Sequence, residues 1–330
     1  MKLNINLGER SYPIYMEPGI LKHMSEYVNL NRKVLIFMDE NVPSSFADVV
    51  KVQCKEAYVK VLPGGETTKS AEMWKECLSE LLKKEFGRKD LIVAIGGGVT
   101  GDLAGFVAAS YMRGISFVNV PTTPLSQIDS SIGGKTAINM DGVKNCVGAF
   151  HQPIAVFLDS MTLQSLPKRH YRNGMVEALK AGFIQDPVIL DLMEEDVYKN
   201  ESEIILRSLQ MKKKIVEEDE TEQGIRKILN FGHTIGHGIE SYFDCKDVLH
   251  GEAVAVGMDK LLTGDNRKRL RRILDSLKIP YNLSYDTDKV LEYMLKDKKR
   301  TADTLTLVKV YTAGEAVLET VKVSELKNLL

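Results

Sequence analysis

Three of the six histidines in this 330-residue chain lie close together, which indicates a metal site. His233 and His237 are four residues apart, and His250 follows. On a helix this spacing puts both imidazoles on one face, as in H-E-x-x-H zinc sites, although the glutamate of that motif is absent. A structural or solvated histidine pair is the alternative, and spacing does not identify a third ligand.

Glycines surround the first two histidines in a segment that otherwise has a helical pattern. Gly232, Gly236 and Gly238 would each cost a helix interior about 1 kcal/mol relative to alanine. Such a cost needs a compensating reason. We therefore expect the backbone to pack closely against another element here.

A second glycine-rich segment predicts a dinucleotide-binding turn. Gly96 to Gly101 follows an apolar run, precedes a helical pattern and matches G-x-G-x-x-G. Its backbone could approach a pyrophosphate at the helix N-terminus. The carboxylate expected about 20 residues later is missing. Asp39 ends an earlier apolar run; if both contact one dinucleotide, the strand order differs from the standard one. A turn that serves only strand–helix packing is the alternative.

A loop that ends in Gly134-Lys135-Thr136 is a candidate for phosphate binding. Asp129 stands where a P-loop requires its first glycine, so an ordinary P-loop is excluded. A lysine at the end of a small-residue loop still suits phosphate as a point charge. A surface turn is the alternative interpretation.

Lys212 is a candidate anion ligand because of its place on a predicted helix, Glu201 to Glu218. It falls within an apolar stripe of Ile205, Leu209 and Val216, whereas Lys214 points away. The side chain either reaches the edge of the core, where water covers its charge, or binds an anion in a cleft. Arg226 could join it in the second case.

Two other charged groups have simpler interpretations. Glu177 and Lys180 are three apart on a predicted helix, where a surface ion pair is expected. Five basic residues between Arg267 and Arg272 are expected to form a solvated helix face.

The elements that must position these residues change character along the chain. Short apolar runs at 34–38, 91–95 and 117–120, with a helical pattern at 70–86, predict a doubly wound parallel sheet. Beyond Asp159 helical patterns dominate, until alternating runs at 305–310 and 316–321 predict a hairpin. We therefore predict an α/β domain over 1–159 and a mainly helical domain over 160–330.

Composition excludes several classes of protein. The 44 basic and 45 acidic residues leave a net charge of −1, which argues against a dedicated nucleic-acid or membrane-surface protein. The four cysteines are far apart with no C-x-x-C pair, which fits reduced thiols in a cytosolic protein better than a disulfide scaffold. No targeting segment or membrane-spanning run is visible.

Together these motifs resemble the 3-dehydroquinate synthase family of the shikimate pathway. The combination of G-K-T at 134–136, L-N-F-G-H-T at 229–234 and H-G-E-A-V at 250–254 is specific to it. The other similar segments, in family order, are 64–69, 96–111 with Arg113-Gly114, 121–123, 129–133, 144–145, 177–180, 224–228, 235–240 and 297–299. The segment between Met258 and Ile279 is shorter than the family pattern.

The resemblance implies a Rossmann-like N-terminal domain, a mostly helical C-terminal domain and a set of site residues. Zn²⁺, or Co²⁺ in its place, would be bound by Glu177, His233 and His250, so that His237 would face the substrate phosphate instead. NAD would be bound by Asp39, Asn41, Glu66, Lys69, Gly96, Gly97, Gly98, Asp102, Thr122, Thr123 and Lys144. Substrate would be bound by Arg113, Asp129, Lys135, Asn145, Lys180, Lys212, Arg226, Asn230, His237 and Lys298. Arg113 would reach the neighbouring subunit's site, which implies a homodimer.

The resemblance also implies a reaction on a small sugar-acid phosphate. In the family, 3-deoxy-D-arabino-heptulosonate 7-phosphate is transiently oxidised by NAD, loses phosphate, is reduced again and closes by an intramolecular aldol step to 3-dehydroquinate. Lys212 and Arg226 would hold its carboxylate. Three alternatives are a sister sugar-phosphate cyclase such as 2-deoxy-scyllo-inosose synthase, a metal-dependent polyol dehydrogenase, and an inactive binding protein with this fold.

Overall fold

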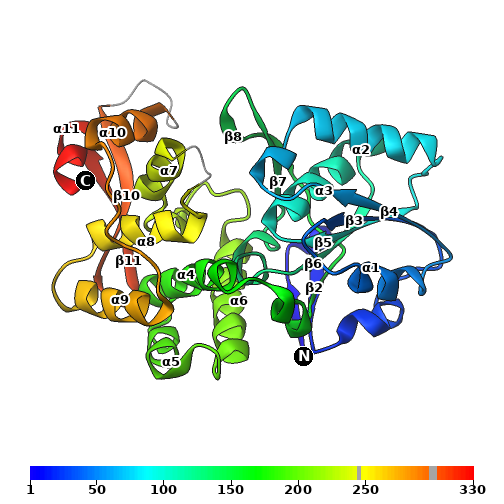
Figure 1. Cartoon of the computed structure of the whole chain (residues 1–330), viewed down its shortest axis with the longest axis horizontal. Coiled ribbons are helices and arrows are strands. Elements are labelled where there is room, and N and C mark those ends of the chain that lie inside the picture. The colour runs from blue at the N-terminus through cyan, green and yellow to red at the C-terminus, as the bar shows by residue number, and fades with distance from the viewer. Residues whose placement is uncertain (244–246, 297–302) are drawn as a thin grey trace. The chain divides into compact units, whose positions relative to one another are not determined.

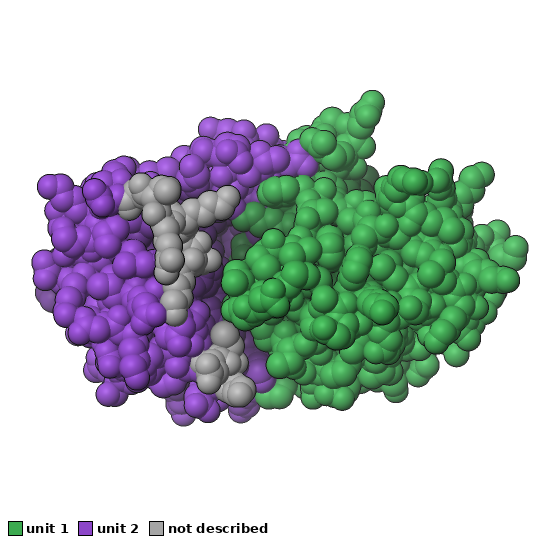
Figure 2. Space-filling model, turned by 90° about the horizontal axis from the view of Figure 1, so that it is seen from above, with its two compact units in different colours: residues 1–167 green, residues 168–330 purple. Residues whose placement is uncertain are grey.

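The chain forms two compact units, Met1–Pro167 and Lys168–Leu330, which Figure 2 colours green and purple. The computed structural model describes residues 1–243, 247–296 and 303–330, apart from the side chain of Lys296. A parallel sheet dominates the first unit and helices dominate the second, so the predicted fold class is confirmed. None of the described helices combines the length and apolar character that crossing a bilayer requires.

A seven-stranded sheet forms the centre of the first unit (Figure 1). Its spatial order is β1-β2-β9-β6-β5-β3-β4, and all neighbours are parallel except β1 and β2. The strands are β1 (Lys2–Ile5), β2 (Tyr12–Met16), β3 (Lys33–Asp39), β4 (Glu56–Leu62), β5 (Leu91–Gly96), β6 (Ser116–Pro121) and β9 (Ala155–Leu158). The predicted strands at 34–38, 91–95 and 117–120 are thus the three adjacent central strands.

Helices cover both faces of this sheet, which explains why the central strands are apolar throughout. Alternate residues of β3, such as Ile36 and Phe37, enter two separate cores. One core includes α1 (Ser44–Lys51) and the short helix η2 (Ile20–Glu26). The other includes α2 (Ala71–Lys83) and α3 (Gly98–Ser110). The helix predicted at 70–86 is α2.

The chain reverses direction across the sheet at β3. It runs from β3 outward to β4 and then returns to β5 on the other side of β3. Ligands of open α/β sheets bind at such a switch point, beyond the carboxyl ends of the strands. Asp39 ends β3 and Gly96 ends the adjacent β5. Asp39 therefore lies beside the glycine turn, although it comes before that turn in the chain. This is the difference from the standard strand order that a shared dinucleotide site would require.

A hairpin of β7 (Lys135–Met140) and β8 (Val143–Phe150) packs on the outer side of α3. A Cβ at Gly105 of α3 would lie 2.3 Å from Thr136 Cγ2, so only glycine permits this approach. The close packing places Lys135, Lys144 and Asn145 on an element that α3 supports.

The described part of the second unit consists of helices and a hairpin (Figure 1). Its helices are α4 (Lys168–Ile184), α5 (Val188–Asp196), α6 (Glu201–Glu218), α7 (His233–Tyr242), α8 (His250–Leu261), α9 (Gly264–Leu277), α10 (Thr287–Lys296) and α11 (Val323–Leu326). α8 packs against both α4 and α7. The short segment after Met258 contains the end of α8 and α9, joined by two residues. The predicted hairpin is β10 (Thr304–Thr312) and β11 (Glu315–Lys322).

The basic face of α9 is solvated only in part: Lys268 and Arg272 are exposed, whereas Arg267 and Arg271 are half-buried and bind an acid of another helix. Arg267 and Arg271 each donate two hydrogen bonds to Asp259 of α8, over 2.7–3.2 Å. The Asp259 side chain is only 2% exposed. A buried carboxylate requires such partners. The spacing of the arginines along α9 could not reveal that their partner is a carboxylate on another helix.

Candidate functional site

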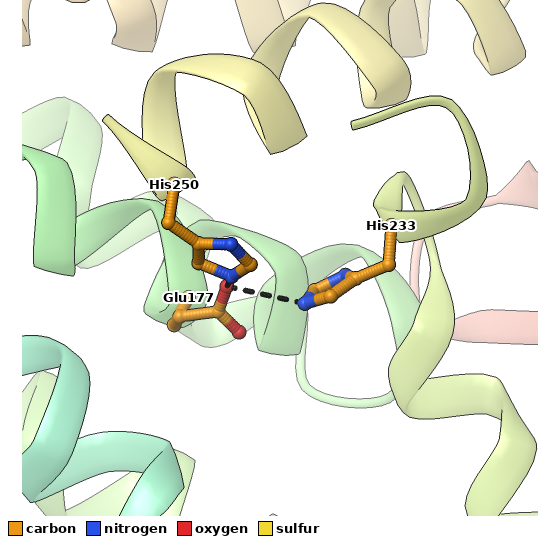
Figure 3. A group of neighbouring side chains, drawn as sticks. All are labelled: Glu177, His233 and His250. Atoms are coloured by element: carbon orange, nitrogen blue, oxygen red, sulfur yellow. Dashed lines mark ion pairs between the residues drawn. The ribbon is translucent and has the colours of Figure 1, made fainter. Parts of the chain in front are cut away.

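Glu177, His233 and His250 converge from three helices, α4, α7 and α8 (Figure 3). Glu177 Oε1 lies 3.4 Å from His250 Nε2 and 3.6 Å from His233 Nε2. Ligands bound about 2.0–2.1 Å from a tetrahedral zinc ion are about 3.3 Å apart, so these separations fit one ion. Three protein ligands leave a coordination position for substrate.

The state of the Glu177 carboxylate also fits a metal ligand. Its side chain is 1% exposed, and among the described residues neither oxygen receives a hydrogen bond. Lys180 Nζ lies 2.5 Å from Oε2, an ionic contact without hydrogen-bond geometry. Burying a carboxylate costs several kcal/mol unless charges compensate it. A divalent cation between Glu177 and the two imidazoles would supply that compensation.

Glu177 and Lys180 do form the predicted ion pair, but not on the surface. The side chains are 1% and 3% exposed, so the expectation of a solvated pair was wrong. α4 is packed on several sides and buries every residue from Asn173 to Ile184. A spacing of three residues shows that two side chains share a helix face, but it does not show whether that face is buried.

Electrostatics prepares the three groups unequally. Burial alone would raise the pKa of Glu177, but Lys180 and the two imidazoles outweigh it and hold that pKa well below its usual range. Burial and Lys180 lower the pKa of His233 to about 3, against the opposing effect of Glu177. Burial also lowers the pKa of His250, but Glu240 and Glu177 together raise it to about 10. A metal ion bound by His250 would therefore displace a proton.

Two glycines fix where His233 stands. Gly232 has a φ of +77° and lies at the N-cap of α7, not inside the helix as its spacing predicted. A Cβ on Gly236 would lie 3.1 Å from the Val254 Cα of α8. The predicted close backbone packing is thus confirmed, and it brings the start of α7 against α8, which carries His250.

His237 lies one turn from His233, and their ring centroids are 5.4 Å apart. It belongs to a second group with Glu240 and His250, whose possible ligand atoms also lie within 4.8 Å of one another. Glu240 is a neighbour of the proposed metal ligands and is not among the predicted site residues. Its signal was its position in H-G-I-E, three residues after His237 and seven after His233 on the same helix.

Lys212 and Arg226 bring two buried positive charges to adjacent elements. Lys212 is 5% exposed on the inner face of α6, as the apolar stripe predicts, whereas Lys214 is exposed. Arg226 is 2% exposed in the short helix η7 (Ile225–Asn230), which packs against α6. Three backbone N–H groups, including that of Arg226, donate to Asp219 and hold this turn.

Asn230 ends the same short helix. Its Nδ2 donates to Glu222 Oε1 at 2.7 Å. Glu222 is not among the predicted site residues, and it has a positive φ of +61°.

The glycine turn of the first unit connects β5 to α3. Gly97 is the N-cap of α3, and a Cβ there would lie 3.2 Å from Thr123 Cγ2. Thr122, which is 3% exposed, donates its backbone N–H to Gly96 O at 2.9 Å. The structure therefore brings Gly96, Gly97 and Gly98 together with Thr122 and Thr123. At the adjacent strand end, Asn41 donates to Asp39 Oδ1.

A second cluster in this unit centres on Lys69, which is 4% exposed. Lys69 Nζ donates to Asp102 Oδ2 at 2.7 Å and to Asn145 Oδ1, and it lies 3.6 Å from Glu66 Oε1. Lys144 is the neighbour of Asn145 on β8. Four residues predicted for NAD or substrate thus contact one another.

Asn139 of β7 links this cluster, and the sequence analysis missed it. Its Nδ2 donates to Glu66 Oε1, its Oδ1 accepts from Asn145 N, and its backbone N–H donates to Lys69 O, each at 2.8 Å. No sequence signal marked it, because asparagine on a hairpin strand belongs to no motif.

The remaining predicted residues of the first unit are on short elements that contact α3. Asp129 is in the π-helix η5 (Ser126–Ser130), and exposed Lys135 begins β7. Exposed Arg113 has a φ of +68° in the turn after α3. Lys298 lies outside the described residues.

Comparison with known proteins agrees with this architecture. The structure of a 2-deoxy-scyllo-inosose synthase complexed with carbaglucose-6-phosphate, NAD⁺ and Co²⁺ has a TM-score of 0.90 and 26% identity, covering 100% of this chain and 99% of that chain. A 2-epi-5-epi-valiolone synthase from Streptomyces hygroscopicus, with NAD⁺ and Zn²⁺ bound, has a TM-score of 0.89 and 25% identity, over 98% and 97%. The chain thus has the fold of these two synthases.

Sequence comparison identifies the family more narrowly. Family models described as 3-dehydroquinate synthase N-terminal and C-terminal match residues 59–173 and 174–300. The 3-dehydroquinate synthase of Clostridium beijerinckii is 39% identical over 340 residues, covering 96% of this chain and 97% of the relative. The chain belongs to the 3-dehydroquinate synthase family.

Proposed function

We propose that the chain is a 3-dehydroquinate synthase, which converts 3-deoxy-D-arabino-heptulosonate 7-phosphate to 3-dehydroquinate and phosphate. The observation that carries the proposal is the convergence of Glu177, His233 and His250 at separations that fit one metal ion, within a family member. A divalent metal, Zn²⁺ or Co²⁺, would polarise a substrate hydroxyl, and NAD would accept and return a hydride.

The chain's own residues would bind and orient the substrate. Lys212 and Arg226 are buried cations on adjacent elements, suited to a carboxylate. In the first unit, Lys135 and Asn145 would hold the phosphate. Asp129, six residues before Lys135, would also bind substrate. In the second unit, His237 would contact the phosphate, and Lys180 and Asn230 would bind substrate beside the metal ligands. Lys298 is proposed for the phosphate from the family resemblance alone.

For NAD we propose the switch point of the first unit. The turn at Gly96, Gly97 and Gly98 would approach the pyrophosphate, and Asp39 with Asn41 would lie at the adjacent strand end. Thr122 and Thr123 flank the turn, while Glu66, Lys69, Asp102 and Lys144 form the neighbouring polar group. The boundary between the NAD-binding and metal-binding domains would fall near Asp159.

A phosphate-release assay tests the proposal. The full chain is incubated with NAD and the heptulosonate phosphate, with and without a metal chelator, and both phosphate and 3-dehydroquinate are measured. We expect equal amounts of both products without the chelator, none after metal removal, and no net NADH. Net accumulation of NADH would instead identify a polyol dehydrogenase, and no turnover with no zinc binding would identify an inactive relative.

A sister cyclase is the second candidate, because the solved 2-deoxy-scyllo-inosose synthase has nearly the same fold. The substrate analogue in that structure, a carbaglucose phosphate, has no carboxylate. Lys212 and Arg226 therefore favour the synthase reaction. Turnover of a carboxylate-free sugar phosphate, with none of the heptulosonate phosphate, would reverse the assignment.

We also propose a cytosolic homodimer in which Arg113 serves the partner's site. Met112, Arg113 and Gly114 all have positive φ, a strained turn that presents an exposed guanidinium. The test mixes two inactive variants, Arg113→Ala and His250→Ala. Recovery of activity in mixed dimers supports the exchange, and no recovery in a dimer that forms contradicts it.

A further inference from the structure

We propose that Glu240 is a positioning residue for the metal centre, which orients His250 without binding the ion itself. Glu240 Oε2 lies 3.1 Å from His250 Nδ1, while His250 Nε2 lies 3.4 Å from Glu177 Oε1. The inference rests on the proposed metal function, and it concerns a residue outside the proposed ligand set.

The chemistry of imidazole explains what this contact does. A neutral imidazole has one N–H and one lone pair, so a carboxylate that accepts at Nδ1 selects the tautomer whose lone pair is on Nε2. That nitrogen is the one that faces Glu177. A carboxylate in this place also makes the histidine a more basic ligand.

The other histidine of the site is held in the same way by a different acceptor. His233 Nδ1 lies 3.1 Å from the Phe231 backbone carbonyl, and its Nε2 faces Glu177. Both imidazoles therefore present Nε2 to one point while Nδ1 is engaged. The main chain supplies one orienting acceptor and Glu240 supplies the other.

The burial of Glu240 supports a specific role. Its side chain is 4% exposed on α7, where a carboxylate is costly unless it is paired. The partner comes from α8, so the contact joins the two helices that carry the histidine ligands. A carboxylate needed only for solubility would lie on the outer face of α7.

Direct ligation by Glu240 is the competing arrangement, because Glu240, His237 and His250 could also surround an ion. That arrangement uses Nδ1 of His250 and leaves Glu177 and His233 outside the centre. Glu177 then keeps two buried oxygens without a hydrogen bond among the described residues. If Glu177, His233 and His250 bind the ion and Glu240 accepts from His250 Nδ1, each of these four side chains has a partner.

The test measures metal binding rather than turnover. Glu240→Leu removes the acceptor at similar volume, and Glu240→Gln keeps an acceptor oxygen without its charge. Zinc affinity of the full chain is measured by competition with a chromophoric chelator, and the Co²⁺ form is examined by visible absorption. We expect Glu240→Leu to bind zinc about 10- to 100-fold more weakly, with Glu240→Gln in between. The Co²⁺ bands should keep their position, because the ligands are unchanged.

Asp259→Asn is the matched control. It alters another buried carboxylate of the same unit, which contacts Arg267 and Arg271 and not an imidazole. We expect wild-type zinc affinity. Folding of each variant is checked by circular dichroism. If Glu240→Leu does not fold, Glu240→Ala, which also removes the acceptor, is used in its place.

Two outcomes would overturn the proposal. Wild-type zinc affinity in a folded variant that lacks the acceptor would show that Glu240 does not position His250. Co²⁺ bands altered in both Glu240 variants, as on loss of a ligand, would show that Glu240 binds the ion. These measurements require no substrate, so their result is independent of whether the chain turns over the heptulosonate phosphate.

Discussion

The region proposed to bind NAD and the proposed metal centre would bind their ligands in opposite ways. The turn at Gly96–Gly98 offers main chain, and its close neighbours are the small side chains of Thr100, Thr123 and Ser130. The proposed metal centre consists of charged or ionisable side chains, of which Glu177 and His233 are buried and His250 is half-buried, with Lys180 beside them. The first depends on the absence of side chains, whereas the second depends on the balance of charges among them.

This difference predicts how each region fails. Adding atoms to the glycine turn creates a steric conflict that a neighbour can partly relieve. Removing a charge from the metal centre leaves its buried partners uncompensated, which is far more costly. Substitutions in the metal centre should therefore have the larger effects.

The largest effect is expected from His250→Ala, which removes one of three proposed ligands. Loss of the bound metal removes several kcal/mol of transition-state stabilisation, so activity should fall about 1,000-fold or more. Bound zinc is measured by atomic absorption and folding by circular dichroism. A folded variant that keeps both metal and activity would contradict the ligand assignment.

Lys212→Met should come next, because it tests a buried charge outside the metal centre. A charge-assisted hydrogen bond contributes about 1.5–3 kcal/mol, so KM for the heptulosonate phosphate should rise about 10- to 100-fold. Substrate binding should suffer more than stability, because an apolar side chain suits the buried face of α6.

Lys214→Met is the control for this substitution, since Lys214 is exposed on the same helix. It should leave both KM and stability unchanged. If Lys212→Met lowers stability but does not weaken substrate binding, Lys212 does not bind the substrate, and its side chain only extends to water at the edge of the core.

The two regions also differ in how far sequence could predict them. The glycine turn was predictable because its signals are contiguous: strand, glycines and helix follow one another within 91–110. Lys212 was predictable because periodicity along one helix gives a face. Asp39 could be proposed only as a strand end, and its position beside Gly96 required the strand order.

The metal centre could not be assembled from spacing. Glu177 is on α4, far along the chain from His233, and only the packing of α4 and α7 on α8 brings them together. The family resemblance implied Glu177 as a ligand where periodicity could not. The same limit explains Glu240 and Asn139, whose roles come from contacts between elements that no single segment contains.

Gly97→Ala tests the steric side of the comparison. The new methyl group would lie 3.2 Å from Thr123 Cγ2, on a turn proposed to approach the pyrophosphate. Crowding of about 1–2 kcal/mol should weaken NAD binding about tenfold, measured by calorimetry, with zinc affinity unchanged.

Gly87→Ala is the control in the same unit. Its Cβ would meet Asp90 Oδ2 at 3.6 Å, an ordinary contact. NAD affinity should stay at the wild-type value. Equal weakening by both alanines would mean that general destabilisation, and not the turn, controls cofactor binding.

The smallest effect on function is expected at Asp259, a buried charge with no proposed part in catalysis, whose replacement should change stability only. Burial alone would raise its pKa, but hydrogen bonds from Arg271 and Arg267 outweigh it and hold that pKa below the usual 3.8. A carboxyl whose pKa is lower in the folded chain stabilises that chain above its unfolded pKa, and this stabilisation disappears as the pH falls through the folded pKa. Asp259→Asn should therefore cost about 1–3 kcal/mol at neutral pH and progressively less in acid.

Denaturation in urea at a series of pH values measures this loss, and zinc titration of the same variant completes the comparison. Asp259 and Glu177 are both buried carboxylates of the second unit, at 2% and 1% exposure. Zinc should stabilise Asp259→Asn by as much as it stabilises wild type, because binding to the folded state adds the same free energy at equal affinity. If zinc stabilised the variant less, Asp259 would act on the metal centre through α8, and burial would no longer separate structural from functional charge in this unit.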